Sequence, residues 1–447
     1  MRNTRVFVGL LLLFLWLFPL VIALGEEDFL VVETVELPEG EGTAAGTDLP
    51  SGEAAAPPTD AALREAPDLT EACSMTFSTK KNASYRKRLI DGNNNTSWAR
   101  GKKKEGWIVL RSEEPIASLY LCFDLQPETW EIQIPPGKIA SGEIASGEEW
   151  VTVWTGPSPY VHVYIPLPSP SRTVRFWCPV TKTRTQIAEL RAYGTGSFPA
   201  GAQNWLPPTE NADILFLATH ADDELIFFGG GIPTYAAERK NRVLVAYLAN
   251  CGKRRTHELL NGLWSMGVRN YPVISPFEDT AQRTMTKEYQ KMGGQNKVRN
   301  WVIALYRQYR PKVVVTHDAR GEYGHVQHRV CAAVAQAAYD AAADPSVDPA
   351  SAEAFGPWQV RKLYLHLAKE NRITMDWDQP LSSLGGITGL EAAVRAFEYH
   401  VSQHPYSMNV TRTGSQYDNR IFGLVRTEVG PDEAGGDFLE HIPLSAE

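Results

Sequence analysis

The second half of the chain alternates between short apolar runs and segments with helical periodicity. Continuous apolar runs occupy residues 214–219, 243–248, 273–274, 313–316 and 363–367. Helical spacing of apolar residues lies between or after these runs, at residues 256–266, 295–309, 329–343 and 390–400. Such alternation predicts a parallel sheet with helices on both faces. In sheets of this kind ligands bind beyond the carboxyl ends of the strands, so functional residues are expected there.

From residue 73 to about residue 194 the pattern is different, because the apolar runs are short and turn residues separate them. Strands are predicted at residues 107–110, 118–125, 130–134, 150–154, 162–165, 173–178 and 187–193. No helical period occurs in this part of the sequence, and no helix is predicted there. About seven short strands with regular turns are typical of an antiparallel β-sandwich.

The chain begins with an apolar segment, and a strongly acidic segment follows it. Arg2 and Arg5 precede the apolar residues 6–24, an arrangement typical of an export signal. Small residues at positions 23 and 25 resemble a cleavage site, but an apolar helix of this length also comes close to spanning a bilayer. The segment is therefore either a cleaved signal peptide or a membrane anchor. Residues 26–72 carry thirteen acidic residues and one arginine, which predicts a disordered, extended linker.

Charge and length narrow the remaining possibilities. The acidic linker accounts for the net charge of -8, since 41 basic and 39 acidic residues follow from Cys73 onward. A folded part that is nearly neutral offers no basic surface for a nucleic-acid partner. The 447 residues are enough for two or three domains. We divide the chain into a signal or anchor at 1–25, a linker at 26–72, a sandwich at 73–196 and an α/β domain at 205–447.

The five cysteines leave at least one thiol unpaired. Cys73 and Cys178 lie near the two ends of the predicted sandwich. In an exported protein they either form a disulfide or remain buried thiols. Cys251 and Cys331 lie in apolar surroundings and are expected in the core of the second domain.

Two of the predicted strand ends are rich in residues that bind metal ions. His220, Asp222 and Asp223 follow the run 214–219, and the loop after the run 313–316 holds His325 and His328. Imidazole and carboxylate ligands together suit zinc, and a catalytic zinc site takes three protein ligands and leaves one position open. The pair His220 and Asp223 has the spacing to share one ion. One further ligand completes the set, so one histidine of the second loop is free for acid or electrophile chemistry.

Both loops resemble the motifs of one enzyme family. Residues 218–224, ATHADDE, are similar to the AHPDDE motif of the zinc-dependent PIG-L/LmbE-type de-N-acetylases. Residues 316–329, THDARGEYGHVQHR, are similar to the second motif of that family, GHPDH. The likeness extends over about residues 211–430. It implies a Rossmann-like fold with a single zinc ion, and hydrolysis of the N-acetyl group of N-acetylglucosamine conjugates.

The resemblance also implies a role for each matching residue. The implied zinc ligands are His220, Asp223 and His328. Asp222 matches the general base, and His325 matches the group that stabilises the oxyanion or protonates the leaving amine. Arg255 matches a substrate-contacting arginine, and a solvent-facing salt bridge is the alternative for it.

Two positions depart from the family pattern. Ala221 stands where the motif has proline, which should loosen the turn without removing a ligand. Gln327 stands between the two histidines where the motif has aspartate. A neighbouring carboxylate favours the protonated imidazole, so we expect the pKa of His325 to be lower without one. Asp318 or Glu322 could take the place of the missing acid.

The predicted sandwich carries a resemblance of its own. The stretches LIDGNNNTSW at residues 89–98 and IAELRAYG at residues 187–194 are similar to discoidin-like (factor 5/8 type C) domains. The resemblance implies a sandwich that binds carbohydrate. A sandwich that only packs against its neighbour is the alternative.

Together these features predict an exported hydrolase that uses one zinc ion to release acetate from an N-acetylated amino sugar. Its N-terminus would associate with a membrane or cell wall. Two alternatives remain: a carbohydrate-binding surface protein with an inactive deacetylase-like domain, and a zinc amidase that acts on another amide. Metal content and amine release distinguish the first alternative, and a substrate screen distinguishes the second.

Overall fold

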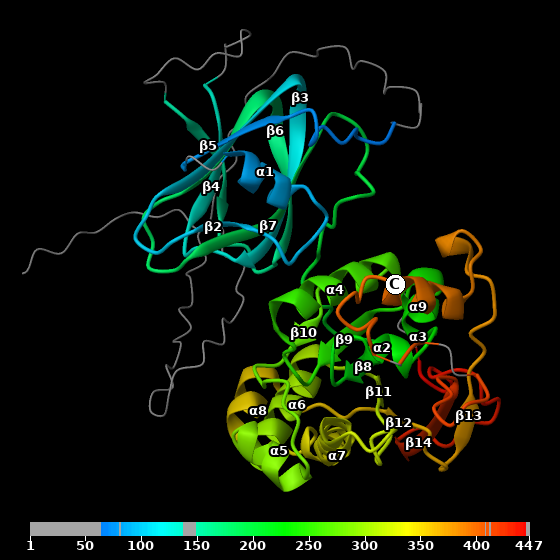
Figure 1. Ribbon diagram of the computed structural model, residues 1–447. Helices are drawn as coiled ribbons and strands as arrows, with labels where there is room; N and C mark the ends of the chain where they lie inside the picture. Colours follow the sequence, from blue (N-terminus) through cyan, green and yellow to red (C-terminus); the bar gives the residue numbers. More distant parts are fainter. Residues whose placement is uncertain (1–63, 80–81, 137–148, 407, 411–412, 444–447) are drawn as a thin grey trace, which may run out of the picture. The chain divides into compact units, whose positions relative to one another are not determined.

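The computed structural model describes residues 64–79, 82–136, 149–406, 408–410 and 413–443 (Figure 1). The predicted export signal, and the predicted acidic linker as far as residue 63, lie outside the described residues. Within the described part of the chain, no helix is long and apolar enough to cross a membrane. Two regions of regular structure follow one another along the chain, and each is described by itself.

The first region is an antiparallel sandwich. Its strands are β1 (Ser74–Phe77), β2 (Trp98–Arg100), β3 (Gly106–Leu125), β4 (Trp130–Ile134), β5 (Val151–Gly156), β6 (His162–Cys178) and β7 (Thr185–Tyr193). The strand order is β2-β7-β3-β6-β4-β5, and β1 also pairs with β3. The first half of β3 pairs with β1 and its second half pairs with β7, while β6 accompanies both halves. The long β3–β6 pair therefore runs through both layers.

The predicted strands are present, but four of them belong to two continuous strands. Residues 107–110 and 118–125 both lie in β3, and residues 162–165 and 173–178 both lie in β6. The stretches that join them are polar or proline-rich and mostly exposed, which resembles a turn in the sequence. Register shifts near the middle of β3 let the strand bend there without ending.

The prediction of no helix in this region was wrong, because helix α1 (Asn82–Leu89) precedes β2. Most of its side chains are polar, and Leu89 is fully buried, so no apolar period marks the helix in the sequence. Cys73 and Cys178 are buried in the sandwich core together with Trp98 and Phe176. Both cysteines are free thiols in the structure, so the disulfide considered from the sequence is absent.

The second region is a seven-stranded sheet with helices on both faces. Its strands are β8 (Ile214–Ala218), β9 (Val243–Tyr247), β10 (Val273–Ile274), β11 (Val313–Thr316), β12 (Lys362–His366), β13 (Arg372–Thr374) and β14 (Ile421–Thr427). The strand order is β10-β9-β8-β11-β12-β14-β13. The first five strands in that order are parallel, whereas β14 is antiparallel to β12 and β13. The prediction of a parallel sheet is right for these five strands and misses the antiparallel edge.

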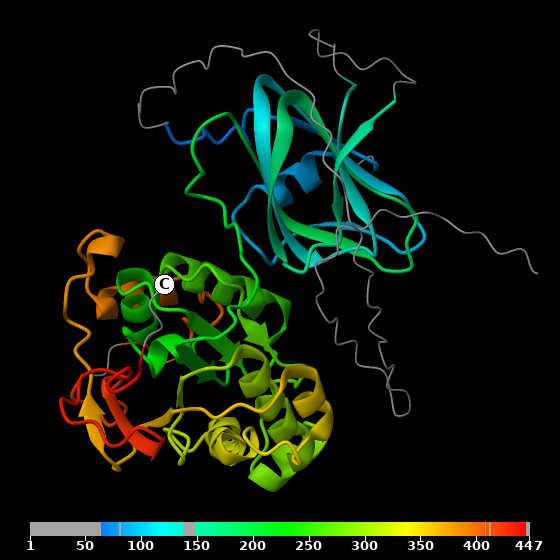
Figure 2. The same cartoon turned by 180° about the vertical axis from the view of Figure 1, so that it is seen from behind.

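Helices cover the two faces of this sheet (Figure 1 and Figure 2). They are α2 (Asp223–Ile226), α3 (Gly231–Pro233), the π-helix η1 (Thr234–Glu238), α4 (Gly252–Ser265), α5 (Met285–Lys291), α6 (Gln295–Tyr309), α7 (Val326–Ala341), α8 (Pro349–Phe355), the 3₁₀ helix η2 (Ser382–Leu384) and α9 (Gly389–Phe397). Phe216 of β8 packs in a core with residues of α4 and α9. Its neighbours Leu215 and Leu217 pack in the opposite core, with residues of α6 and α7. Because both faces are buried, β8 is apolar at every position.

The strand order places β8 at the point where the connections change direction. The chain moves from β8 to β9 and β10 on one side, and then returns to add β11 and β12 on the other side. In open sheets of this kind the crevice for a ligand forms at such a switch point, beyond the carboxyl ends of the strands. The loops that follow β8 and β11 are the two metal-type loops identified from the sequence.

Candidate metal centre

The loop after β8 is held in a tight turn by a buried carboxylate. The backbone of Asp222 has a φ of 129°, in a region that residues other than glycine rarely adopt. Its N–H donates a hydrogen bond of 2.9 Å to Glu224 Oε2, and Glu224 is fully buried. Helix α2 begins directly after the turn, at Asp223. This geometry brings His220, Asp222 and Asp223 to the same end of the sheet.

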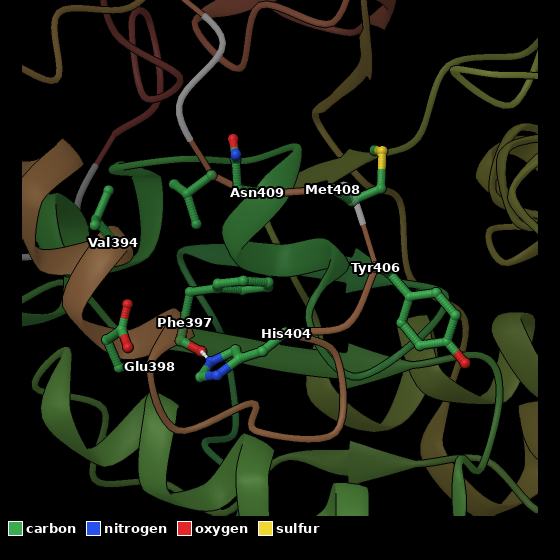
Figure 3. Close-up of a pocket in the computed structure, with 8 residues that line it drawn as sticks. Val394, Phe397, Glu398, His404, Tyr406, Met408 and Asn409 are labelled. Carbon is green, nitrogen blue, oxygen red and sulfur yellow. Dashed lines mark hydrogen bonds between the residues drawn. The ribbon is translucent and has the colours of Figure 1, made fainter.

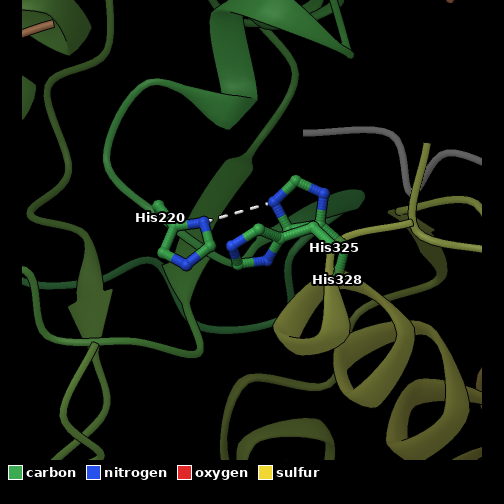
Figure 4. Close-up of side chains that lie close together, drawn as sticks. All are labelled: His220, His325 and His328. Carbon is green, nitrogen blue, oxygen red and sulfur yellow. Dashed lines mark hydrogen bonds between the residues drawn. The ribbon is translucent and has the colours of Figure 1, made fainter. Parts of the chain in front are cut away.

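The loop after β11 depends on a glycine to return to helix α7. Gly321 has a φ of 77°, and a Cβ atom at this position would lie 2.4 Å from the carbonyl oxygen of His325. His325 is the N-cap of α7, and His328 lies in the first turn of that helix. The rings of His325 and His328 face His220 across the gap between the loops (Figure 4). The ring centroids of His220 and His325 are 4.8 Å apart.

Three potential ligand atoms meet between the two loops. His220 Nδ1 lies 3.0 Å from Asp223 Oδ2, and His328 Nε2 lies 3.2 Å from each of those two atoms. Tetrahedral ligands about 2.0–2.1 Å from a zinc ion lie about 3.3 Å from one another. The triangle therefore has the size and the ligand chemistry of a zinc site. Its three members are the residues that the family resemblance implied.

His317 also faces this cluster, but another bond occupies the ring nitrogen that points towards it. Besides that triangle, two overlapping groups of close ligand atoms occur among the described residues, namely His220, His325 and His328, and Asp223, His317 and His328. His317 Nε2 accepts a hydrogen bond of 2.9 Å from the backbone N–H of Thr219. Because that lone pair is used, His317 supports the first loop and is a poor ligand.

Hydrogen bonds to the outer ring nitrogens fix the tautomers of both ligand histidines. The amide oxygen of Gln327 accepts a bond of 2.7 Å from His220 Nε2–H, which leaves the Nδ1 lone pair free for a metal. Glu322 Oε2 accepts a bond of 2.8 Å from His328 Nδ1–H, which leaves Nε2 free. Ligand histidines in metal sites usually have such an acceptor, and it orients the ring.

From the sequence we expected Gln327 to influence His325, but the hydrogen bonds of its side chain go to other residues. It is fully buried, accepts from His220, and donates a bond of 3.0 Å to Glu288 Oε1 on α5. The pKa of His325 is lowered to about 3, first by burial and then by the neighbouring charges of His328 and His220. The direction of the expected shift is present, but burial is its leading cause, and the imidazole is neutral at pH 7.

Neither of the two possible substitute acids serves His325. Asp318 accepts hydrogen bonds from the backbone N–H and the Nε–H of Arg320. The carboxylate of Glu322 is used by His317, His328 and His366. His325 Nδ1 is buried and has no hydrogen-bond partner among the described residues.

Asp222 and Arg255 form a buried pair beside the ligand triangle. Arg255 Nη2 lies 2.6 Å from Asp222 Oδ1 and also contacts the carbonyl oxygen of Ala221. Arg255 therefore faces the site, and its ion pair with Asp222 is largely buried, unlike the solvent-facing salt bridge that was the alternative. Burial raises the pKa of Asp222 above its ordinary value, although the charge of Arg255 opposes that change. A carboxylate with a raised pKa is suited to accept and return a proton near neutral pH.

A cavity of about 570 Å³ opens onto these groups. It is lined by His220, Asp222, Asp223, Ile226, Phe227, Arg255, Asp279, Tyr323, His325, Phe397, Gln403, Tyr406, Met408 and Tyr417. A neighbouring hollow of about 370 Å³ shares Phe397, Tyr406 and Met408 with it, but no residue of the ligand triangle lines it (Figure 3). The larger cavity thus combines charged groups at the sheet end with aromatic side chains from later segments.

Several residues of this cavity were missed in the sequence. Asp279 follows the strand β10, and its carboxylate lies 3.6 Å from His220 Nε2 and 3.9 Å from Arg255 Nη1. The rule that ligands lie beyond strand ends could have found it. Tyr323, Tyr406 and Tyr417 are exposed or half-buried and lie in loops, where no periodic pattern distinguishes them.

Comparison with known proteins identifies the second region. Residues 215–339 match the PIG-L family, which is described as GlcNAc-PI de-N-acetylase. These residues form a PIG-L family domain. The family resemblance found in the sequence is thereby confirmed for the PIG-L domain, whose matched segment contains both metal-type loops.

Similar proteins include two that are named as deacetylases. The 1D-myo-inositol 2-acetamido-2-deoxy-alpha-D-glucopyranoside deacetylase 1 of Frankia alni is 30% identical over 32% of this chain and 59% of its own length. The protein of the same name from Catenulispora acidiphila is 25% identical over 52% of this chain and 79% of its own length. The chain thus spans about three fifths of the first of these relatives.

Two solved structures are each similar to part of the chain. The N,N'-diacetylchitobiose deacetylase from Pyrococcus horikoshii is 17% identical, with a TM-score of 0.35, over 44% of this chain and 72% of that chain. An F5/8 type C domain from Bacteroides fragilis is 21% identical, with a TM-score of 0.24, over 29% of this chain and 96% of that chain.

The second loop yields a stability prediction. Gly321→Ala should destabilise the metal-free protein more than Gly324→Ala does. Both glycines have a positive φ, 77° and 91°, so either substitution adds backbone strain of about 1–2 kcal/mol. Only at Gly321 would the new Cβ also meet backbone, since nothing lies within 4 Å of a Cβ at Gly324. Thermal unfolding of the two variants measures the difference, and equal melting temperatures would contradict the close approach.

Proposed function

We propose that the PIG-L domain is a zinc-dependent deacetylase that hydrolyses the N-acetyl group of an N-acetylated amino sugar. The observation that carries the proposal is the triangle of His220 Nδ1, Asp223 Oδ2 and His328 Nε2, whose sides measure 3.0–3.2 Å. His220 and Asp223 line the cavity, so an ion held by the triangle would be accessible to a ligand. Asp222, next to one ligand in sequence, lines the same wall.

A zinc ion held there would act as a Lewis acid and activate water at neutral pH. Asp222 would accept the proton of the attacking water. The Asp222 carboxylate keeps its position through Arg255, at 2.6 Å, and through the strained turn that Glu224 holds. Because burial raises its pKa, the protonated acid is also able to return the proton to the leaving amine.

His325 would stabilise the oxyanion as a neutral donor. Its lowered pKa of about 3 disfavours the imidazolium form, so its proton is not readily given up or taken up at pH 7. A neutral N–H aimed at a developing oxyanion still contributes by hydrogen bonding inside a cavity that excludes water. This division of roles gives proton transfer to Asp222 and charge stabilisation to His325.

The cavity supports a sugar as the substrate. Its volume falls within the range of about 300–1,000 Å³ that ligand sites occupy. Arg255 and Asp279 offer charged partners for hydroxyl groups, and Tyr323, Phe397 and Tyr406 offer aromatic surfaces for the apolar faces of a sugar ring. The relatives named above as deacetylases of acetamido-glucopyranoside compounds favour the N-acetylglucosamine class.

We infer from the N-terminal sequence that the protein is exported, and that residues 1–25 are either removed or keep it at a membrane. The sandwich would then hold a glycan by weak binding while the PIG-L domain acts on it. If the sandwich alone were functional, acetate release would be absent from every N-acetylated glycan tested. An amidase with another substrate would show zinc binding without release of acetate.

The metal assignment predicts one zinc ion per chain. Elemental analysis of the purified protein should give about one zinc, and the chelator-treated enzyme should regain acetate release from N-acetylglucosamine glycosides when zinc is restored. His328→Ala should lose the ion, because only two of the three ligands remain. Full zinc occupancy in that variant would refute the ligand set.

The base assignment predicts that Asp222→Asn keeps zinc but lowers kcat by about 10²–10⁴-fold, the usual contribution of a general base. The matched control is Asp213→Asn at the opposite end of β8, where the carboxylate accepts from the backbone N–H of Arg242. That variant should keep normal turnover. Steady-state kinetics on one N-acetylated substrate compares the two, and unaltered kcat in Asp222→Asn would exclude it as the base.

A further inference from the structure

The buried carboxylate of Glu322 contacts three histidines at the candidate metal centre. The side chain of Glu322 is fully buried and accepts four hydrogen bonds. The donors and distances are His317 Nδ1 at 3.2 Å, His328 Nδ1 at 2.8 Å, His366 Nδ1 at 3.1 Å and the backbone N–H of Asp318 at 2.9 Å. Three of these bonds reach Oε1 and one reaches Oε2, so both carboxylate oxygens are engaged.

These bonds reach both loops of the metal centre. On the second loop, Glu322 takes the Nδ1 proton of His328 and so directs the Nε2 lone pair to the metal position. On the first loop it acts through His317, whose protonated Nδ1 faces Glu322 and whose Nε2 accepts from Thr219 N–H. Thr219 directly precedes His220. One carboxylate thereby sets a ligand tautomer on one loop and the backbone position of a ligand on the other.

A third strand fixes the carboxylate itself. His366 ends β12, and its Nε2 lies 3.1 Å from the carbonyl oxygen of Asp418 while its Nδ1 faces Glu322. Both ring nitrogens of His366 therefore face acceptors. The cluster joins the ends of β11 and β12 and leaves Glu322 no freedom to turn towards His325.

The backbone at this position is strained, although the loop around it contains glycines. Glu322 has a φ of 52°, in the left-handed region, which costs an ordinary residue about 1–2 kcal/mol. Glycine at this position would adopt the same backbone without that cost. The hydrogen bonds of the Glu322 side chain to three imidazoles and one backbone N–H therefore offset this strain.

We propose that Glu322 is a positioning residue of the metal centre, which fixes the His328 tautomer directly and the first ligand loop through His317. The inference rests on the zinc site of the proposed function. It goes beyond that function because it assigns the geometry of the ligands to a residue that touches neither the substrate nor the ion.

The test is the zinc affinity of Glu322→Gln, measured by chelator competition in the absence of substrate. The glutamine has the same size, but one of its two terminal groups is an NH₂ that cannot accept. If the NH₂ faces His328, it favours the wrong tautomer of that ligand. If it faces His317 instead, the support of Thr219 is lost. In either orientation zinc affinity should fall by about 10–100-fold, the usual effect of losing an outer partner of a ligand.

Glu258→Gln is the matched control, since Glu258 is also a buried carboxylate of the PIG-L domain. It accepts from the backbone N–H and hydroxyl of Ser402 and from Arg254, and it contacts no ligand of the triangle. Its zinc affinity should equal that of the wild type. Circular dichroism of the metal-free proteins establishes that each variant is folded at the temperature of the assay.

The outcomes separate this inference from the proposed function. A wild-type protein that binds no zinc overturns the proposed function, and the inference falls with it. Wild-type affinity in Glu322→Gln overturns the inference alone. If Glu322→Gln does not fold, Glu322→Asp replaces it, because aspartate keeps the charge and withdraws the carboxylate by one methylene. A weakened zinc affinity in the aspartate variant supports the positioning role, and an unchanged affinity contradicts it.

Discussion

Three acceptor atoms from two different loops lie only 3.0–3.2 Å apart at the end of the parallel sheet. Two imidazole lone pairs and a carboxylate oxygen repel one another at this distance unless a cation or a proton lies between them. The fold brings them together because β8 and β11 are adjacent and parallel, so their carboxyl ends share one edge. Buried outer partners, Gln327 for His220 and Glu322 for His328, then turn each ring towards the common point.

Burial at this site also explains why the proposed mechanism gives proton transfer to Asp222 and oxyanion stabilisation to His325. Burial, and after it the charges of His328 and His220, lowers the pKa of His325, so that imidazole is held neutral. Asp222 is more deeply buried than His325, and there burial favours the protonated acid while Arg255 keeps the charged form accessible. Burial disfavours the charged form of both groups, so it lowers the pKa of His325 and raises the pKa of Asp222.

Local sequence patterns predicted the central elements well. Helix α6 and strand β11 have the predicted bounds, because an apolar period or a continuous buried run is visible within the element itself. The strand-end rule also located both metal-type loops. The antiparallel strand β14, which lies between β12 and the edge strand β13, was missed, since nothing within residues 421–427 specifies the direction of its partners. Helix α1 was missed because it is almost entirely polar.

The partners within the site could be predicted less well, because they depend on side chains far apart in the sequence. Gln327 lies two residues from His325, yet it bonds to His220 and to Glu288 on another helix. Glu322 was considered only as a substitute acid, whereas His366, which is 44 residues away, occupies part of its carboxylate. Packing between distant helices and strands determines these hydrogen-bond partners, and the spacing of residues in the sequence does not reveal them.

The central claim is that His220, Asp223 and His328 bind one zinc ion. The X-ray absorption spectrum of the zinc-loaded protein tests it most directly. The account predicts nitrogen and oxygen ligands only, at about 2.0–2.2 Å, with the multiple scattering of two imidazole rings. Scattering from a sulfur ligand near 2.3 Å, or from three imidazole rings, would contradict the proposed ligand set.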